Sequence, residues 1–150
     1  MYCKQARREE DDRNCQFDFL GYTFRPRRVT DRMGKRFVGF VPAISDKAAK
    51  AMRQEMRRDG VLRRYDLSLN ELAARTRPKL LGWMQYYGQF YRSALVNTLR
   101  TIDEALVRWA RRKYKRLRHH KMRAWAWLNG VKSRQPGLFA HGSLKTVVGR

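Results

Sequence analysis

Cysteine and histidine are scarce in this chain, and their placement argues against disulfide and metal chemistry. Cys3 and Cys15 are too few for a disulfide scaffold. Together with His119, His120 and His141 they form no CxxC or HxxxH spacing, so we expect no zinc site. The sequence also has no apolar run of about 18 residues and no secretory signal. These shortages predict a protein of the reducing cytoplasm without a membrane span.

Motifs of catalysis are missing as well. The sequence contains neither a P-loop nor a GxSxG motif. Asp103 and Glu104 are neighbours on an expected helix and therefore face different directions, whereas two carboxylates that share a metal must converge. Asp11 and Asp12 lie in an acidic loop that no Gly-rich turn follows. We predict no active site contained wholly in this chain, no metal site and no cofactor.

Acidic residues are far outnumbered by basic ones, and this imbalance predicts the kind of partner. The chain has 13 Asp and Glu against 35 Lys and Arg, which gives a net charge of +22. No acidic residue follows Glu104. Arginine, which forms planar two-point contacts with phosphate, outnumbers lysine. We therefore expect a polyanion along the C-terminal third, with RNA or DNA favoured over acidic proteins and anionic lipid.

The chain does have 150 residues and 43% apolar side chains, which is enough for one folded domain. Residues 16–24 alternate in the manner of a β-strand, and residues 38–41 predict a second strand. The polar residues 25–35 between them include Pro26 and Gly34, so we expect a hairpin with a long basic loop. Residues 1–14 are expected to form a strand end followed by a loop.

Signals that start and end helices mark the rest of the chain. Ser45 is an expected N-cap, Ser68 and Glu71 have the spacing of a capping box, and Pro78 fits the first turn of a further helix. We expect helices over about 45–58, 68–75, from 78 to near 88, 97–118 and 121–130, with an irregular segment after residue 136. The predicted fold class is α+β, mainly α, with an N-terminal β-hairpin followed by a small helical bundle.

Aromatic and basic residues occur together along residues 78–117. Trp83, Tyr86, Tyr87 and Tyr91 lie at helix-compatible spacing among cations. Two explanations stay open for these aromatics: they form the core of the bundle, or RNA bases stack on them. The next expected helix carries an apolar stripe of Leu99, Ile102, Leu106 and Trp109, which ends where a basic run begins.

Cations of the hairpin loop and of the basic run are the expected RNA contacts. The run from 111 to 118 has more cations than a helix C-terminus needs to offset its dipole, although each hairpin or helix cation could also be a solvated surface residue. The candidates are Arg25, Arg27, Arg28, Lys35, Arg36, Arg92, Arg111, Arg112, Lys113, Lys115, Arg116, Arg118, His119 and Lys121.

Several ordered stretches resemble the C-terminal part of bacterial group II intron reverse transcriptase/maturases. They are FDFLGYTFRPR at 17–27, PAIS at 42–45, LLGWMQYYGQFYRSAL at 80–95 and WARRKYKRL at 109–117. LFAH at 138–141 is similar to the family's tail, and YCK at 2–4 is similar to the strand before its FLGY hairpin. The resemblance covers essentially the whole chain, although Gly142 stands where the family usually has an aromatic residue.

The resemblance implies a division of the chain into three parts. Residues 1–44 would be the end of a reverse-transcriptase palm, with the hairpin near the primer grip. Residues 45–123 would be the maturase-specific thumb domain, which in the family binds intron RNA and flanks the template–primer duplex. Residues 124–150 would be a short helix and a basic tail. The family's fingers, its palm aspartates with their Mg ions, and the HNH endonuclease module of many relatives have no counterpart in this sequence.

These features predict an RNA-binding maturase domain that binds group II intron RNA, supports its splicing and lacks a polymerase active site. One alternative is the thumb and primer grip of a split RNA-directed DNA polymerase, with an upstream fingers and palm chain as partner. Another is a truncated mobile-element remnant without function. For the first two we expect a bacterial cytoplasmic protein associated with nucleic acid.

Overall fold

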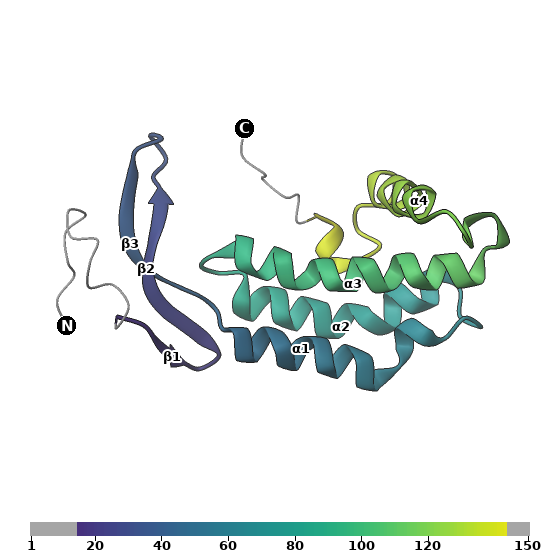
Figure 1. Cartoon of the computed structure of the whole chain (residues 1–150), viewed down its shortest axis with the longest axis horizontal. Coiled ribbons are helices and arrows are strands. Elements are labelled where there is room, and N and C mark those ends of the chain that lie inside the picture. The colour runs from purple at the N-terminus through teal and green to yellow at the C-terminus, as the bar shows by residue number, and fades with distance from the viewer. Residues whose placement is uncertain (1–14, 144–150) are drawn as a thin grey trace.

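The computed structural model describes residues 15–143 and has a small antiparallel sheet at one end of a helical bundle (Figure 1). The predicted fold class, α+β and mainly α, is confirmed. The expected strand end and loop at 1–14 lie outside the described residues. The elements are β1 (Phe17–Phe19), β2 (Tyr22–Thr30), β3 (Arg36–Ile44), α1 (Asp46–Asp59), η2 (Val61–Arg63), α2 (Leu69–Tyr87), α3 (Arg92–Lys113), η3 (Lys115–Leu117), α4 (Lys121–Arg134) and η4 (Ala140–Ser143).

The sheet has the strand order β1-β2-β3, and both neighbouring pairs are antiparallel. Leu20 and Gly21 join β1 to β2 with φ angles of 49° and 81°, the sign pattern of a two-residue hairpin turn. The predicted single strand over 16–24 was therefore wrong, because this turn divides it. A side chain at Gly21 would be strained for two reasons: its φ is positive, and a Cβ atom there would lie 2.6 Å from the Tyr87 hydroxyl.

The predicted long basic loop over 25–35 was also wrong. Residues 25–30 continue β2 and pair with β3, from Arg25 opposite Val41 to Thr30 opposite Arg36. Pro26 is tolerated there because β1 pairs only with residues 22–24, so this part of β2 has a neighbour on one side only. The true loop is 31–35, where the Asp31 carboxylate accepts hydrogen bonds from the backbone N–H groups of Met33 and Lys35, each at 2.8 Å.

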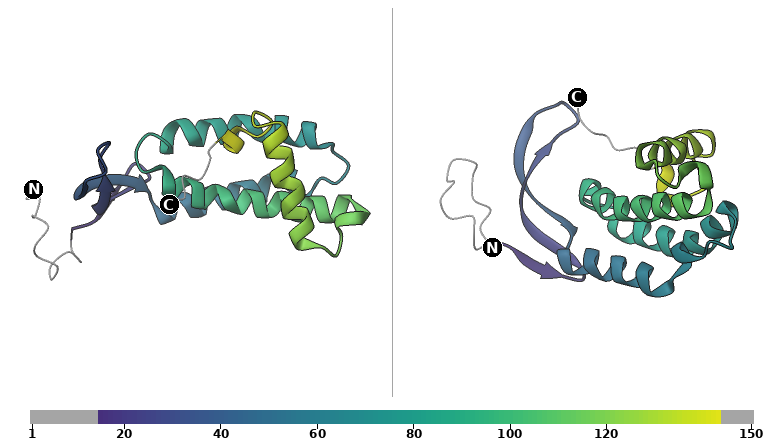
Figure 2. Two further views of the ribbon diagram at one scale, coloured as in Figure 1. Left: turned by 90° about the horizontal axis from the view of Figure 1, so that it is seen from above. Right: turned by 45° about the vertical axis from the view of Figure 1, so that its right-hand side comes forward.

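The helices pack around one apolar core. Figures 1 and 2 show α1, α2 and α3 lying side by side and α4 crossing over α3. The predicted stripe of Leu99, Ile102, Leu106 and Trp109 is buried along its whole length, with Trp109 fully enclosed. This stripe makes α3 the central helix, in contact with α1, α2 and α4.

Local capping signals set the first two helix starts as predicted. Ser45 caps α1 by accepting a hydrogen bond from the Ala48 N–H at 3.1 Å, and Gly60 ends the helix at φ 65°. Ser68 and Glu71 form the predicted capping box of α2. The helix then continues through Pro78 to Tyr87, so the prediction of two separate helices was wrong. Burial of Leu72 and Leu80 on both sides of the proline offsets its cost of about 3 kcal/mol.

The predicted bounds of α3 were shifted. The helix begins at Arg92 instead of near 97 and ends at Lys113 instead of near 118. It ends because Tyr114 adopts an extended conformation and places its ring 5.8 Å from Trp109 and 5.4 Å from Trp127, measured between ring centroids. The basic run is consequently divided between the end of α3 and η3.

The last described segments return to the bundle. α4 begins at Lys121 as predicted and continues to Arg134, beyond the predicted end near 130. The segment after Pro136, predicted to be irregular, includes η4, and Phe139 and His141 are buried. The Asp103 carboxylate of α3 holds this region: it contacts Lys132 Nζ of α4 at 2.6 Å and His141 Nε2 of η4 at 2.8 Å.

Candidate nucleic-acid interface

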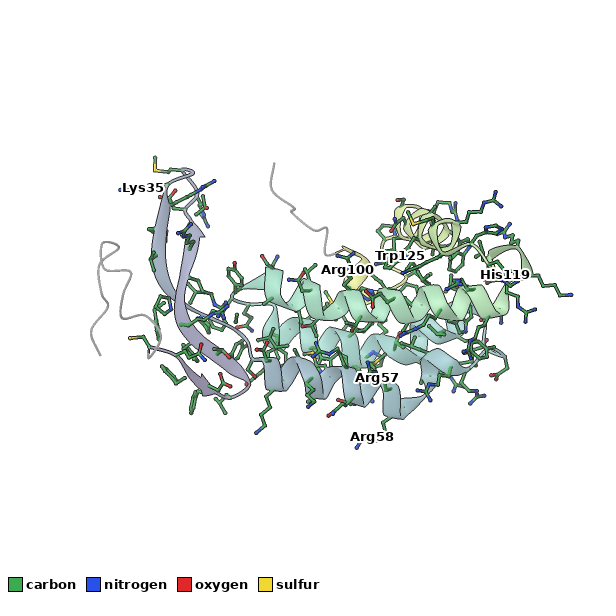
Figure 3. The ribbon with its side chains drawn as sticks, viewed as in Figure 1. Lys35, Arg57, Arg58, Arg100, His119 and Trp125 are labelled. Carbon is green, nitrogen blue, oxygen red and sulfur yellow. The ribbon has the colours of Figure 1, made fainter. Side chains whose placement is uncertain are left out.

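The predicted hairpin cations lie on the β2–β3 ribbon. Arg25, Arg28, Lys35 and Arg36 are exposed, and Figure 3 shows Lys35 at the far tip of the hairpin. Arg27 differs, because its Nε donates to the Val41 carbonyl at 3.2 Å and its guanidinium lies 5.1 Å from the centre of the Tyr91 ring. Burial, together with the charge of Arg25, lowers the pKa of Arg27. The other four hairpin cations are therefore accessible to a phosphate group from solvent, whereas Arg27 is bound within the protein.

The predicted cations of the basic run fall into two groups. The first group is used within the molecule. Arg111 Nε donates to the Arg118 carbonyl at 3.3 Å, and Arg112 donates to the Tyr65 hydroxyl at 3.0 Å. Lys113 Nζ donates to the carbonyl oxygens of Tyr65 at 3.0 Å and Leu67 at 2.5 Å.

The second group has exposed side chains and forms what we call the distal cluster: Lys115, Arg116, Arg118, His119 and Lys121. Figure 3 shows His119 at the opposite end of the molecule from Lys35. The predicted contacts therefore form two patches with the bundle between them. Arg92 lies apart from both at the start of α3, where its Nε donates to the Gly88 carbonyl at 3.0 Å.

Two of the predicted aromatic residues have a role within the protein. Tyr86 and Tyr87 lie at the junction of sheet and bundle, where both rings pack within 5.4 Å of the Tyr22 ring, measured between centroids. The Tyr22 hydroxyl donates to the Tyr86 carbonyl, and the Tyr86 hydroxyl donates to the Leu20 carbonyl at 3.0 Å. Burial raises the pKa of Tyr22 and of Tyr87, which favours their neutral phenols. These tyrosines connect the two parts of the molecule.

A groove on the bundle was not predicted. It encloses about 670 Å³ between α1 and α3, with Trp83 of α2 and the segment 60–65 completing its walls. We call it the arginine groove, because five arginines line it together with a floor of apolar side chains. The arginines are Arg53, Arg57, Arg63, Arg108 and Arg112, and the apolar residues include Met52, Met56, Leu62, Leu99 and Ile102.

A periodic signal for this groove exists in the sequence. Arg53 and Arg57 follow Met52 and Met56 by one position, and the pairs 53/57 and 108/112 each have the i, i+4 spacing that places two residues on one helix face. Each pair therefore borders a buried stripe. Residue spacing within a helix does not indicate which helices pack together, so the sequence alone could not assign the five arginines to one groove.

The described part of the chain, residues 15–143, has neither a cluster of metal ligands nor a membrane-spanning helix. No three His, Cys, Asp or Glu side chains in this part gather in a way that could hold a metal ion. No helix in the same part combines the length and apolar composition needed to cross a bilayer.

Comparison with known proteins identifies the bundle. Neither the curated proteins nor the solved structures gave a significant match. The family model for the group II intron maturase-specific domain matches residues 49–125, which include most of α1, all of α2 and α3, and the start of α4. This match spans half of the chain and contains both the arginine groove and the distal cluster. The chain therefore belongs to the family of group II intron maturase-specific domains.

Proposed function

We propose that this chain binds the RNA of a group II intron and helps it to reach its splicing-competent fold. The observation that carries the proposal is the overlap between the family match and the basic surface of the bundle. All five arginines of the groove and all five cations of the distal cluster lie within residues 49–125. A large net positive charge of +22 supports a polyanionic partner.

The proposed contacts are mainly contacts to phosphate. The distal cluster and the exposed hairpin cations would hold RNA backbone near opposite ends of the molecule, and the arginine groove would contact it between them. Double-stranded RNA is recognised chiefly by its shape and its phosphates, because side chains cannot read its deep, narrow major groove. Arg27 and Lys113 contribute less in this proposal, since their cationic groups are bound to protein carbonyls.

A salt titration tests the proposal. We expect the affinity of the full chain for a group II intron RNA to fall about 1,000-fold between 50 and 200 mM salt, because several phosphate contacts release counter-ions. The measurement is filter binding or fluorescence anisotropy with the intron RNA and with an unrelated structured RNA of equal length. A dissociation constant that does not change with salt contradicts phosphate contact, and equal affinity for both RNAs contradicts intron recognition.

A second function is favoured by one observation on the sheet. Phe17, Phe19 and Val38 lie on the same face as Phe24 and Phe40 by strand alternation, and 44%, 60% and 44% of their respective surfaces are exposed. We call these five residues the sheet patch. A partner chain carrying fingers and palm could cover it, and the chain would then supply the thumb and primer grip of a split RNA-directed DNA polymerase.

A further inference from the structure

The arginine groove combines strong positive charge with an apolar floor. Within residues 15–143, no ion pair or hydrogen bond involves the side chains of Arg53, Arg57, Arg63 and Arg108. The one acidic residue among the lining residues is Glu104. Four guanidinium groups without an acceptor among the described residues therefore line one cavity. Such groups bind phosphate through two parallel N–H donors.

The floor is suited to a flat apolar group rather than to water. Met52, Met56, Leu99 and Ile102 are at most 6% exposed, and they line the cavity together with the partly buried Trp83. The volume of about 670 Å³ lies within the range of sites that hold small organic ligands, about 300–1,000 Å³. A heterocyclic base has the shape and the apolar faces for this floor, and indole or thioether groups pack well against such faces.

Tyr65 lines the groove and is held in place by α3. Trp109 Nε1 donates to the Arg64 carbonyl at 2.9 Å, and Lys113 Nζ donates to the carbonyls of Tyr65 and Leu67. Arg112 lies over the Tyr65 ring, with its guanidinium carbon 5.6 Å from the ring centroid. These contacts attach the 64–67 connection to α3, so this part of the lining is formed without a ligand.

The groove also presents hydrogen-bond acceptors, which suit a ligand that brings donors as well as negative charge. The hydroxyls of Thr98 and Thr101 donate to the carbonyls of Ala94 and Thr98, at 3.2 and 2.8 Å, so their oxygen atoms remain as acceptors. Glu104 adds a carboxylate. A phosphate or carboxylate alone has no donor for these groups, so a ligand that satisfies them carries a donor beside its anionic group. Adenine, guanine and cytosine have exocyclic amino groups that can donate to them.

We propose that the arginine groove receives an unpaired nucleotide of the bound RNA, with its amino-bearing base on the floor beside Trp83 and its phosphates between the arginines of α1 and α3. The inference rests on the proposed RNA binding and specifies what one part of the interface recognises. A base within an intact duplex cannot enter the groove, because its faces are stacked and its edges paired. The nucleotide therefore comes from a bulge, loop or single strand of the RNA.

Two hairpin RNAs test the inference with the full chain. One hairpin is fully paired, and the other has a single 2-aminopurine bulge. We expect the bulged RNA to bind about tenfold more tightly, because its unpaired base stacks in the groove, and we expect the 2-aminopurine fluorescence to change on binding. A bulged uridine, which lacks an amino group, should bind less tightly than a bulged adenosine. Equal affinity for paired and bulged RNA with unchanged fluorescence overturns the inference.

Matched arginine variants locate the effect. Figure 3 shows Arg57 lying over the bundle and Arg58, the next residue of α1, pointing away from it. Arg57→Gln and Arg108→Gln should abolish the preference for the bulged RNA, whereas Arg58→Gln and Arg100→Gln, which do not line the groove, should preserve it. All four arginines are exposed, and thermal unfolding checks that each variant is folded. Equal loss in all four variants overturns the inference.

The remaining outcomes separate this inference from the proposed function. Tight, salt-dependent binding of intron RNA without any preference for a bulge leaves the proposed function standing and overturns the groove assignment. Absence of binding to every RNA overturns both. Competition by a glutamate-rich peptide that displaces the bulged RNA as effectively as unlabelled bulged RNA assigns the groove to an acidic protein instead, and so overturns the inference.

Discussion

Lys113 and Lys115 are two positions apart and carry the same charge, yet they have different surroundings. Lys113 Nζ is bound to the carbonyls of Tyr65 and Leu67 and lies 5.3 Å from the centre of the Trp109 ring. Lys115 opens η3 and is exposed. The sequence run from 111 to 118 predicts the same role for both residues, because it contains no information about the 64–67 connection that lies beside Lys113.

Substituting these two lysines separates stability from binding. Lys113→Met should lower the free energy of unfolding by about 1–3 kcal/mol, because two carbonyls lose a charged donor. It should leave the salt dependence of RNA binding unchanged. Lys115→Met should do the reverse, with unchanged stability and a log–log salt slope reduced by about one. Urea unfolding and salt-dependent anisotropy measure both effects, and a stable Lys113→Met variant with a reduced slope contradicts this assignment.

At the scale of elements, Asp103 joins α3 to α4 and η4. It is 16% exposed, and its partners are Lys132 and His141. Burial alone would raise the pKa of Asp103, but the hydrogen bonds and charges of His141 and Lys132 lower it below its usual value near 3.8. A carboxyl with a depressed pKa stabilises the folded state above its unfolded pKa. That contribution is lost as the pH falls through the folded-state pKa.

The lowered pKa of Asp103 predicts how the stability of an Asp103→Asn variant depends on pH. At pH 7 the variant should be about 3 kcal/mol less stable than the wild type, because Lys132 loses its buried counter-charge. The difference should shrink below pH 4 as the wild-type carboxyl becomes protonated. Thermal unfolding across this pH range measures it, with the neighbouring, exposed Glu104→Gln as control. A difference that is the same at pH 3 and pH 7 contradicts the role of the ion pair.

Local signals explain which elements were predictable. Ser45, Gly60 and the Ser68–Glu71 capping box act within one helical turn, and the structure confirms each of them. The extension of α2 through Pro78 and of β2 through Pro26 depends on partners distant in sequence: the bundle core in the first case and β3 in the second. A proline in the sequence indicates the local cost of continuing a helix or strand. It gives no information about the tertiary packing that offsets this cost.

At the scale of the whole molecule, charge composition predicted a polyanionic partner but not the shape of the surface that we propose binds it. The two predicted cationic patches are at opposite ends, and the arginine groove between them arises only when α1 packs beside α3. The sheet patch likewise depends on register, which places Phe17 opposite Phe24 and stacks their rings 4.9 Å apart. Both features require contacts that periodicity within one segment does not specify.

The sheet patch gives the last prediction, which concerns the split-polymerase function. We expect primer extension when the chain is mixed with a separately produced fingers and palm chain of a group II intron reverse transcriptase, and none from either chain alone. Phe19→Glu should abolish this activity, because a charge on a buried interface is costly to desolvate. Phe19 is 60% exposed, and no ring contact with it is recorded among residues 15–143, so the fold should tolerate the change.

Met33→Glu is the matched control, because Met33 is 94% exposed in the 31–35 loop and does not belong to the sheet patch. It adds the same charge to the same hairpin and should preserve both co-purification of the two chains and primer extension. If the wild-type mixture is inactive, the chain does not complete a polymerase with that partner. If both variants are equally active, the contact lies elsewhere, since a carboxylate at position 19 would disrupt any partner packed on the sheet patch.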